Sequence, residues 1–528
     1  MLIGYVSDER YVALPDVLLE FISSEGASTE TRSRASGSIH ADLTPGPYQV
    51  VLHCEGYGLK RVSMTVAENR PYQFRLLKDD LLGYMWPKWV QSGERSEFRV
   101  HCDEAYKLEL FRYGMGKEFI KPIGWYDEHG PGATVQITPD GDYTQTGVQW
   151  NRFGYTNPHH KQYLTAPDRS GLYYCHASTA TGRFFSFPWI VAPKTPQHSI
   201  AVLASNVNWN CYNNFGGRSN YIHPDRFPPT PTVNARLELN RYTNGEHINY
   251  GTEDYAPLSF DRPEPISHIP LDVGPKDPIE GRAASHVAEA EWRLLAWMEQ
   301  EGFNYDLWAE THLHFGQLNL DDYKVLVIST HPEYWSEEMY FGVKKWVFER
   351  GGKLMYLGGN GLNAKVEFLD ESTMKVWNGD ARVMQEKGLE SRFHIYVESE
   401  ANLLGVVFTD TGIMTAAPYR VIDADHWIFE GTGKANGDLF GEASLHMRIP
   451  GGASGHETDK VSPSSPPNVH TVAKGENPDE GGGEIVHFDT DSGGGVFSVG
   501  SITWPSSIMV DETVSRMTAN VLRRFTSC

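Results

Sequence analysis

The chain has 528 residues, which is too long for one hydrophobic core and favours about three domains. Its net charge of −22 argues against nucleic acid or an anionic membrane as a partner. No stretch approaches the roughly 18 apolar residues of a membrane span. The opening MLIGYVSDERY has neither the basic nor the apolar region of a signal peptide. We therefore expect a cytoplasmic protein with no membrane contact.

Residues 1–80 alternate in hydrophobicity as strands do, and turns rich in glycine and proline separate them. The strand-like segments are VLLEFIS, GSIHADL, YQVVLHC and LKRVSMTV. The segments PDVLLEF (15–21) and SGSIHADLTPGPYQVVLHCEGY (36–57) resemble those of the carboxypeptidase regulatory-like family of small β-sandwiches. This first module is therefore expected to be a β-sandwich, and such modules commonly serve as spacers or docking surfaces.

Residues 81–195 form a second all-β stretch. The string DRSGLYYC (168–175) resembles strand F of an immunoglobulin-type sandwich, in which a tyrosine lies two residues before the cysteine. Cys102 lies 73 residues before Cys175, a spacing typical of an inter-sheet pair. In a reducing cytosol both are expected to remain thiols.

Residues 196–528 change to an α/β pattern, in which apolar strands alternate with helical segments. The most informative part is 323–363. Lys324–Ser329 predicts a buried strand, Ser336–Arg350 a helix capped by Ser336, and Lys353–Leu357 a second strand after a Gly-Gly stop. A βαβ unit of this kind requires parallel strands, and open parallel sheets bind ligands beyond the carboxyl ends of their strands. His331, Glu333 and Tyr334 follow the first strand at that edge.

Several familiar catalytic motifs are absent, including GxxxxGK[ST], GxSxG and HExxH. The remaining candidates are mostly phenols and carboxylates. These are hard oxygen ligands, which suit iron(III) better than zinc. They occur as Tyr212, Tyr221, Tyr305, Asp306, Glu333, Tyr334, Glu386, Glu457 and Asp459, with His331 and His456 beside them.

The α/β part resembles class I glutamine-amidotransferase-like domains. The turns STHPEYW and LGGNGLN stand where such domains carry a nucleophilic cysteine, and neither holds one. From about residue 200 onward the chain also resembles the large (beta) subunit of the N,N-dimethylformamidase family. The matching strings are NCYNNFGGRSNY, SFDRPEP, EWRLLAWMEQEGFNYD, VISTHPEYWS, GGKLMYLGGNG, GHETD and GGEIVHFDT.

The resemblance implies a mononuclear iron amidase in which two tyrosines and one carboxylate hold Fe(III). Carried onto this sequence, it gives Tyr334 as one ligand, Glu386 as the carboxylate, and either Tyr305 or Tyr212 as the second tyrosine. Glu457, His331 or His456 would move protons to the leaving amine. The expected fold is thus two N-terminal β-sandwich modules followed by a glutamine-amidotransferase-like α/β domain with a mainly parallel sheet.

Two other interpretations are consistent with the sequence. One is a non-catalytic binding protein of the glutamine-amidotransferase-like fold. The other is a hydrolase of the same fold that cleaves a different C–N bond, which the change from GGNGFYW in relatives to GGNGLNA here favours. The expected substrate is a small amide. The resemblance also implies a small second subunit as a partner, and the sequence leaves open both that subunit and a homo-oligomer.

Overall fold

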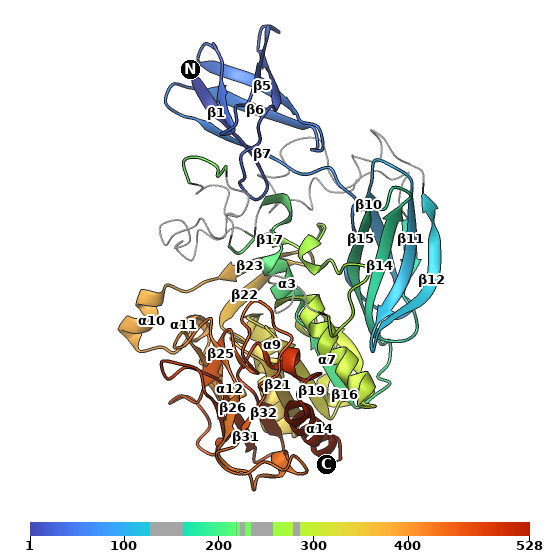
Figure 1. The fold of residues 1–528 in the computed structure, drawn as a ribbon, viewed down its shortest axis with the longest axis vertical. Helices are drawn as coiled ribbons and strands as arrows, with labels where there is room; N and C mark the ends of the chain where they lie inside the picture. Colours follow the sequence, from blue (N-terminus) through green and yellow to red (C-terminus); the bar gives the residue numbers. More distant parts are fainter. Residues whose placement is uncertain (127–161, 218, 222–227, 234–256, 278–285, 528) are drawn as a thin grey trace.

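The computed structural model describes residues 1–126, 162–217, 219–221, 228–233, 257–277 and 286–527. Strands outnumber helices throughout this part, so the protein is a β-rich, multidomain molecule. The N-terminal strands lie at one end of the molecule and the C-terminal helix α14 (Glu512–Ser527) lies at the other (Figure 1). No helix among the described residues has the length and apolar character needed to cross a membrane.

The first 80 residues form two facing sheets around one core. One sheet has the order β4-β1-β7 and the other β3-β2-β5-β6. Side chains in β6 alternate strictly between buried and exposed, as the sequence pattern predicts for a sandwich strand. The strands are β1 (Leu2–Asp8), β2 (Leu18–Ser23), β3 (Ser28–Arg32), β4 (Ser38–His40), β5 (Gly46–His53), β6 (Lys60–Val66) and β7 (Tyr72–Leu76). The resemblance of this module to the carboxypeptidase regulatory-like family stays a prediction.

A second pair of sheets follows, with the orders β13-β10-β8 and β12-β11-β14-β15-β9. The Tyr173 hydroxyl donates a 2.7 Å hydrogen bond to the Arg169 carbonyl, as in the tyrosine corner of immunoglobulin-type domains. Cys102 and Cys175 are both buried free thiols, as expected. The strands are β8 (Leu82–Trp86), β9 (Trp89–Gln91), β10 (Arg95–His101), β11 (Tyr106–Tyr113), β12 (Lys117–Tyr126), β13 (Gln162–Thr165), β14 (Gly171–Thr179) and β15 (Phe184–Ala192).

The C-terminal part is built on a nine-stranded sheet of order β18-β16-β19-β21-β32-β31-β30-β26-β27. The first five strands run parallel and the remaining pairings are antiparallel. The sheet is therefore less parallel than the sequence suggested. A tight turn joins β31 to β32, and a short connection of this kind forces an antiparallel pair. The strands are β16 (Ile200–Ala204), β18 (Asp306–Ala309), β19 (Val325–Thr330), β21 (Lys353–Gly358), β26 (Tyr419–Val421), β27 (Leu439–Phe440), β30 (His470–Gly475), β31 (Glu484–Asp489) and β32 (Gly495–Ser498).

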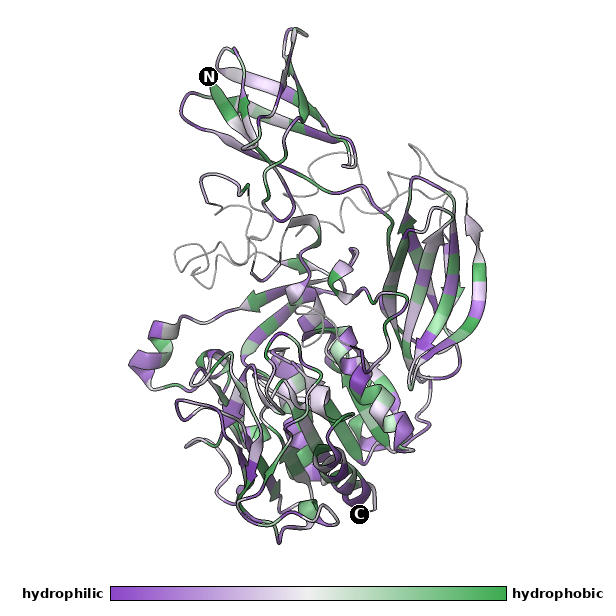
Figure 2. Cartoon of the chain, in the orientation of Figure 1, coloured by the Kyte–Doolittle hydropathy of each residue, from purple (hydrophilic) through white to green (hydrophobic). Residues whose placement is uncertain are grey.

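The βαβ unit predicted from the sequence is confirmed. Helix α9 (Glu337–Arg350) connects β19 to β21, which pair in parallel. The Ser336 hydroxyl accepts a hydrogen bond from the Met339 N–H, and Gly351 ends the helix with a φ of 79°. Val325 and Val327 pack in the core cluster that includes residues of α7 (Ala288–Gln300) and α14, whereas Leu326 and Ile328 pack in the cluster that includes residues of α9. Helices thus cover both faces of the parallel strands, which Figure 2 shows as largely hydrophobic.

The remaining described elements surround this sheet. A smaller sheet of order β17-β23-β22-β20 extends from it towards the first module (Figure 1). Its strands are β17 (Leu258–Ser259), β20 (Tyr334–Trp335), β22 (Ala364–Asp370) and β23 (Thr373–Trp377). The other elements are α3 (Asn206–Tyr212), η2 (Phe215–Gly217), η4 (Pro265–Ser267), α8 (Glu310–His314), η5 (Leu320–Asp322), α10 (Ala381–Lys387), α11 (Arg392–Tyr396), α12 (Ala401–Leu404), β24 (Val407–Thr409), β25 (Ala416–Ala417), η6 (Trp427–Phe429), β28 (Ser454–Gly455), β29 (Thr458–Lys460) and α13 (Trp504–Ser507).

Because β19 is central and fully buried, its side chains should dominate the stability of the C-terminal part. Replacing Leu326, which is 0% exposed, with alanine should lower the free energy of unfolding by about 2–5 kcal/mol. Urea denaturation followed by tryptophan fluorescence would measure the change. A loss below about 1 kcal/mol would mean that the core collapses around the missing side chain or that β19 is not central.

Candidate functional site

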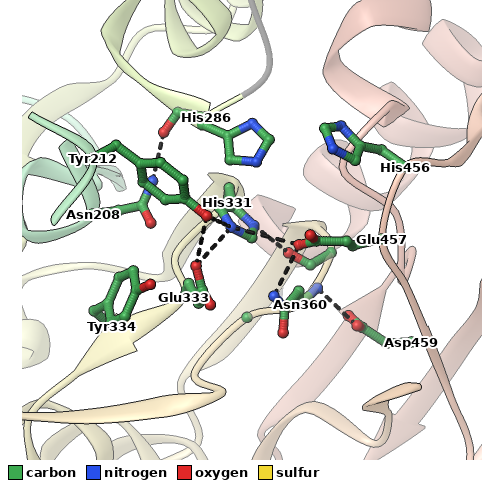
Figure 3. A network of polar contacts seen from close by, with 12 residues as sticks. Asn208, Tyr212, His286, His331, Glu333, Tyr334, Asn360, His456, Glu457 and Asp459 are labelled. Carbon is green, nitrogen blue, oxygen red and sulfur yellow. Dashed lines mark hydrogen bonds and ion pairs between the residues drawn. The ribbon is translucent and has the colours of Figure 1, made fainter. Parts of the chain in front are cut away.

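The candidate site lies at the carboxyl ends of the parallel strands, where the βαβ argument places it. Strand β16 leads into α3, which ends at Tyr212, and β19 leads into His331, Glu333 and Tyr334. Asn360 follows β21, and Glu457 lies between β28 and β29 (Figure 3). Thr330, Asn360 and His456 have positive φ values of 66°, 50° and 68°. Non-glycine residues rarely adopt such angles, and they concentrate at functional sites.

Three phenol oxygens and one carboxylate converge at this edge. The Tyr212 hydroxyl lies 2.9 Å from Glu333 Oε2, and the Tyr221 hydroxyl lies 2.8 Å from that of Tyr212 and 3.3 Å from the same carboxylate oxygen. The Tyr334 hydroxyl is 2.6 Å from that of Tyr221. Burial raises the pKa of the Tyr334 phenol well above its usual value. Four oxygens of types that hard metal ions prefer therefore share one small volume.

His331 joins this oxygen cluster to a second carboxylate. Its Nε2 is 3.0 Å from Glu333 Oε2 and 3.6 Å from Glu457 Oε2, and its Nδ1 donates to the Gly359 carbonyl at 3.1 Å. Burial lowers the pKa of His331, but the hydrogen bond that its ring donates to Glu333 and the charges of both carboxylates outweigh this effect, so the net pKa is raised. Asn360 Nδ2 donates to Glu457 Oε2 at 2.9 Å and fixes that carboxylate. A histidine between two held carboxylates is suited to proton transfer.

Two more histidines, His286 and His456, lie next to one another near His331 (Figure 3). The His286 ring lies 4.4 Å from that of His331 and 4.8 Å from that of His456. One ligand atom from each of His286, His331 and Glu457 falls within 4.8 Å of the others, which makes these three a candidate metal-binding group in its own right. Two histidines and one carboxylate are ligands that zinc and iron(II) both accept.

Buried carboxylates hold the N-terminus of α3 and thereby position Tyr212. Glu291 accepts from the Ser205 N–H and, at 2.8 Å, from Trp209 Nε1. Glu310 accepts from the Val207 N–H at 3.3 Å and from Trp335 Nε1 at 2.7 Å, so it ties α3 to β20. Burial raises the pKa of Glu291 to about 8, against the lowering effect of these bonds. These contacts fix the elements that carry Tyr212 and Tyr334 relative to one another.

The raised pKa of Glu291 predicts a pH dependence of stability. Because the folded pKa of about 8 exceeds the ordinary value of 4.5, the folded chain retains a proton that the unfolded chain releases. Stability that is present below about pH 4.5 is therefore lost as the pH rises to about 8. A Glu291→Gln variant should lose less stability between these limits, by an amount on the order of a few kcal/mol. Urea denaturation at about pH 5 and pH 8 would measure this, and equal losses in both proteins would contradict the assignment.

The structure brings together most of the residues named from the sequence. Tyr212, Tyr334, His331 and Glu457 lie at one site, and His456 lies beside it, with its Nδ1 3.3 Å from His446 Nε2.

The structure does not bring Glu386 or Tyr305 to this site. Glu386 is exposed on α10, a largely hydrophilic helix that projects from the domain (Figures 1 and 2). Tyr305 precedes β18 and therefore lies at the amino edge of the parallel strands, where its hydroxyl contacts Glu299 and Arg112. Strand direction alone separates Tyr305 from the other candidates, since the site lies at the opposite edge.

The sequence placed Glu333 at the strand edge and Tyr221 among the candidate oxygen ligands, but it gave neither of them a specific ligand or catalytic role. It did not point to His286 or Asn360. A signal for Glu333 was present in the extended segment HPEYW, because side chains two residues apart along an extended chain point to the same side. His331 and Glu333 follow this rule. His286 lies just before α7, and no local pattern marks it.

Comparison with known proteins identifies the family. The family model described as "N,N-dimethylformamidase beta subunit-like, C-terminal" matches residues 120–518. The N,N-dimethylformamidase beta subunit of an Alcaligenes species is 28% identical over 290 residues, which cover 45% of this chain and 36% of the relative. The beta subunit from Paracoccus aminophilus is 28% identical over 285 residues, with the same coverage.

The match thus spans little more than a third of the length of these curated relatives. Among solved structures, a DUF3823 family protein from Bacteroides ovatus matches 34% of this chain and 92% of its own at 10% identity, with a TM-score of 0.12 that supports no argument about the fold. The family match covers most of the chain, including every residue of the site. The chain therefore belongs to the N,N-dimethylformamidase beta subunit-like family.

Proposed function

We propose that this protein is an amide hydrolase that cleaves the C–N bond of a small or N-substituted amide. The observation that carries the proposal is the convergence of Tyr212, Tyr221, Tyr334 and Glu333 beside the His331–Glu457 pair. The two relatives named as N,N-dimethylformamidase beta subunits support the same class of reaction. We further propose that the C-terminal domain has the glutamine-amidotransferase-like fold without the cysteine nucleophile of that group.

The donor set fits iron(III). Tyr212, Tyr221 and Glu333 offer phenolate and carboxylate oxygens within 3.3 Å of one another, and these are hard ligands of the kind that Fe(III) prefers. We propose these three as the ligands, with Tyr334 hydrogen-bonded next to them in place of the ligand role expected from the sequence. Bound iron would supply a Lewis acid that polarises the amide carbonyl or lowers the pKa of a water molecule.

The protein side chains supply the remaining steps. Tyr221 and Glu457 are partly exposed, whereas Tyr212, His331, Glu333 and Tyr334 are buried, so the substrate approaches between the first two. Glu457, held by Asn360, is placed to accept the proton of the attacking water. His331, protonated between its two carboxylates, can then donate a proton to the leaving amine nitrogen. Burial of Tyr212, His331 and Glu333 keeps bulk water away from them and strengthens the interactions among them.

His286, His331 and Glu457 provide a second candidate set of metal ligands, and this set favours a zinc-type centre. The two sets share His331 but predict different properties. Tyrosinate-bound Fe(III) is coloured, and zinc bound by histidine and glutamate is not. A metal that is lost in His286→Ala and retained in Tyr221→Phe would favour the histidine set.

The amidase proposal can be tested by measuring amine release from a panel of small amides that includes N,N-dimethylformamide, formamide, larger carboxamides and ureas. We expect turnover of at least one member by the metal-loaded chain. Because the relatives are named beta subunits, the assay should be run with and without a candidate small second subunit. If metal-loaded protein turns over none of these substrates in either form, the non-catalytic interpretation replaces the proposal.

A further inference from the structure

The N-terminal module (residues 1–80) forms hydrogen bonds with the chain on both sides of Tyr221. The segment that carries Tyr221 leaves α3 after Tyr212, and the module contacts it both before and after Tyr221. We infer that the first β-sandwich is a positioning element of the active site, with Arg75 and Tyr11 as its positioning residues. The inference deepens the proposed function, because it names what holds one of the proposed metal-binding tyrosines in place.

The first anchor is the side chain of Arg75, at the end of β7. Arg75 is completely buried, and its Nη1 donates a 2.7 Å hydrogen bond to the Gly217 carbonyl, four residues before Tyr221. Its Nη2 donates to the Glu9 carbonyl within the module. Gly217 has a φ of +76°, and a Cβ there would lie 2.4 Å from Arg75 Nη1. The segment thus approaches the guanidinium group as closely as only glycine permits.

The second anchor lies seven residues beyond Tyr221. The Tyr11 hydroxyl donates a 2.5 Å hydrogen bond to the Pro228 carbonyl. The chain at Thr232 then pairs with the module, since the Thr232 N–H donates to the Tyr11 carbonyl at 3.1 Å and the Ala13 N–H donates to the Thr232 carbonyl at 2.7 Å. Gln73 Nε2 adds a bond to the Pro229 carbonyl at 3.0 Å.

Between the two anchors lie the residues that meet the site. Asn220 Nδ2 donates to the Tyr334 hydroxyl at 3.0 Å, and the Tyr221 hydroxyl contacts Tyr334, Tyr212 and Glu333. A shift of this segment would therefore move a phenol out of the oxygen cluster. Phe215 also packs with Leu77 and Tyr84, at the junction between the first and second modules.

These contacts exceed what a spacer module needs. Removing a charged group from water is costly unless the group is well hydrogen-bonded. A module that served only as a spacer would therefore not need an arginine that is 0% exposed, as Arg75 is. The module lies entirely before residue 120, where the family match begins. The arrangement therefore assigns a part of the chain outside the matched region to the positioning of a residue inside it.

The test compares Arg75→Met with Arg32→Met in the metal-free chain of 528 residues. Arg32 belongs to the same module, but it is exposed, and among the described residues its side chain pairs with the Asp16 carboxylate and the Asp16 carbonyl. Amide hydrogen exchange of the segment 211–221 should quicken at least about tenfold in Arg75→Met, as the loss of hydrogen bonds to a charged group implies, and should not change in Arg32→Met. Exchange in β19 and α9 should stay the same in both variants. Equal exchange of 211–221 in the two variants would overturn the inference.

A second variant keeps the test decisive if Arg75→Met fails to fold. Tyr11→Phe removes one hydroxyl and retains the ring, and it should quicken exchange of the Thr230 and Thr232 amides, which are the two amide hydrogens of 228–232, relative to the unaltered chain. Unchanged exchange there would also overturn the inference. Since neither measurement needs metal or substrate, both stand even if the amidase proposal fails. In active protein, Arg75→Met should lower kcat more than it raises KM, and Arg75→Lys should restore part of the loss, which a general loss of stability would not produce.

Discussion

Replacing Glu333 with glutamine should give a folded protein that no longer retains iron. Glu333 Oε2 is the atom shared by the Tyr212 hydroxyl, the Tyr221 hydroxyl and His331 Nε2. A glutamine of the same shape removes the negative charge that would balance the metal. Changing groups that only support a ligand already costs about 10–100-fold in metal affinity, so loss of this carboxylate should cost at least the upper end of that range.

Metal analysis of the purified variant, with its melting temperature, would measure the effect. Glu349→Gln, an exposed carboxylate near the end of α9, removes the same charge away from the site and should leave the iron content unchanged. An unchanged iron content in Glu333→Gln would remove this residue from the ligand set.

Glu457→Gln should lower kcat by about 10²–10⁴-fold, the range for losing a general acid or base, while the iron content stays near that of the unaltered chain. Glu457 is held by Asn360 and lies 3.6 Å from His331 Nε2, but it contacts none of the three tyrosine hydroxyls through a described hydrogen bond. A glutamine can keep the shape of the side chain but cannot accept the proton of water.

The outcome for Glu457→Gln separates the two metal proposals. If His286, His331 and Glu457 hold the metal, the substitution should release it, and activity and metal content should fall together. Glu442→Gln, at an exposed position in the same C-terminal region, serves as the control for charge. Normal kcat in Glu457→Gln would exclude this residue from proton transfer.

The sequence predicted the βαβ unit of 324–357 and the edge of the sheet where the site lies, because local patterns determine both. The strand, cap, helix and glycine stop of 324–357 are each marked by residue type, and parallel strand order then places His331, Glu333 and Tyr334 at the ligand edge. Tyr305 could have been set aside by the same reasoning, because it precedes its strand. The antiparallel half of the sheet was missed because the short turn between β31 and β32 was not used to assign strand direction.

Other features depend on contacts that no local pattern records. Tyr221 lies in the oxygen cluster, while Gly217 before it and Pro228 after it hydrogen-bond to the N-terminal module, and no local pattern in the sequence records these contacts. His286 meets His331 across 45 positions of chain, and Asn360 faces Glu457 across 97. The resemblance implied Glu386 as a ligand, but Glu386 is exposed on α10, away from the site.

The most direct test of the tyrosine–glutamate metal centre is the metal content and visible spectrum of protein purified without chelators or a metal-affinity column. The account predicts near-stoichiometric iron and a tyrosinate-to-iron charge-transfer band, both lost in Tyr212→Phe and in Tyr221→Phe. In Tyr334→Phe, which removes a hydroxyl hydrogen-bonded to Tyr221, the band should shift but persist. A colourless protein that takes up no iron, or a band that survives the loss of both Tyr212 and Tyr221 hydroxyls, would contradict the account.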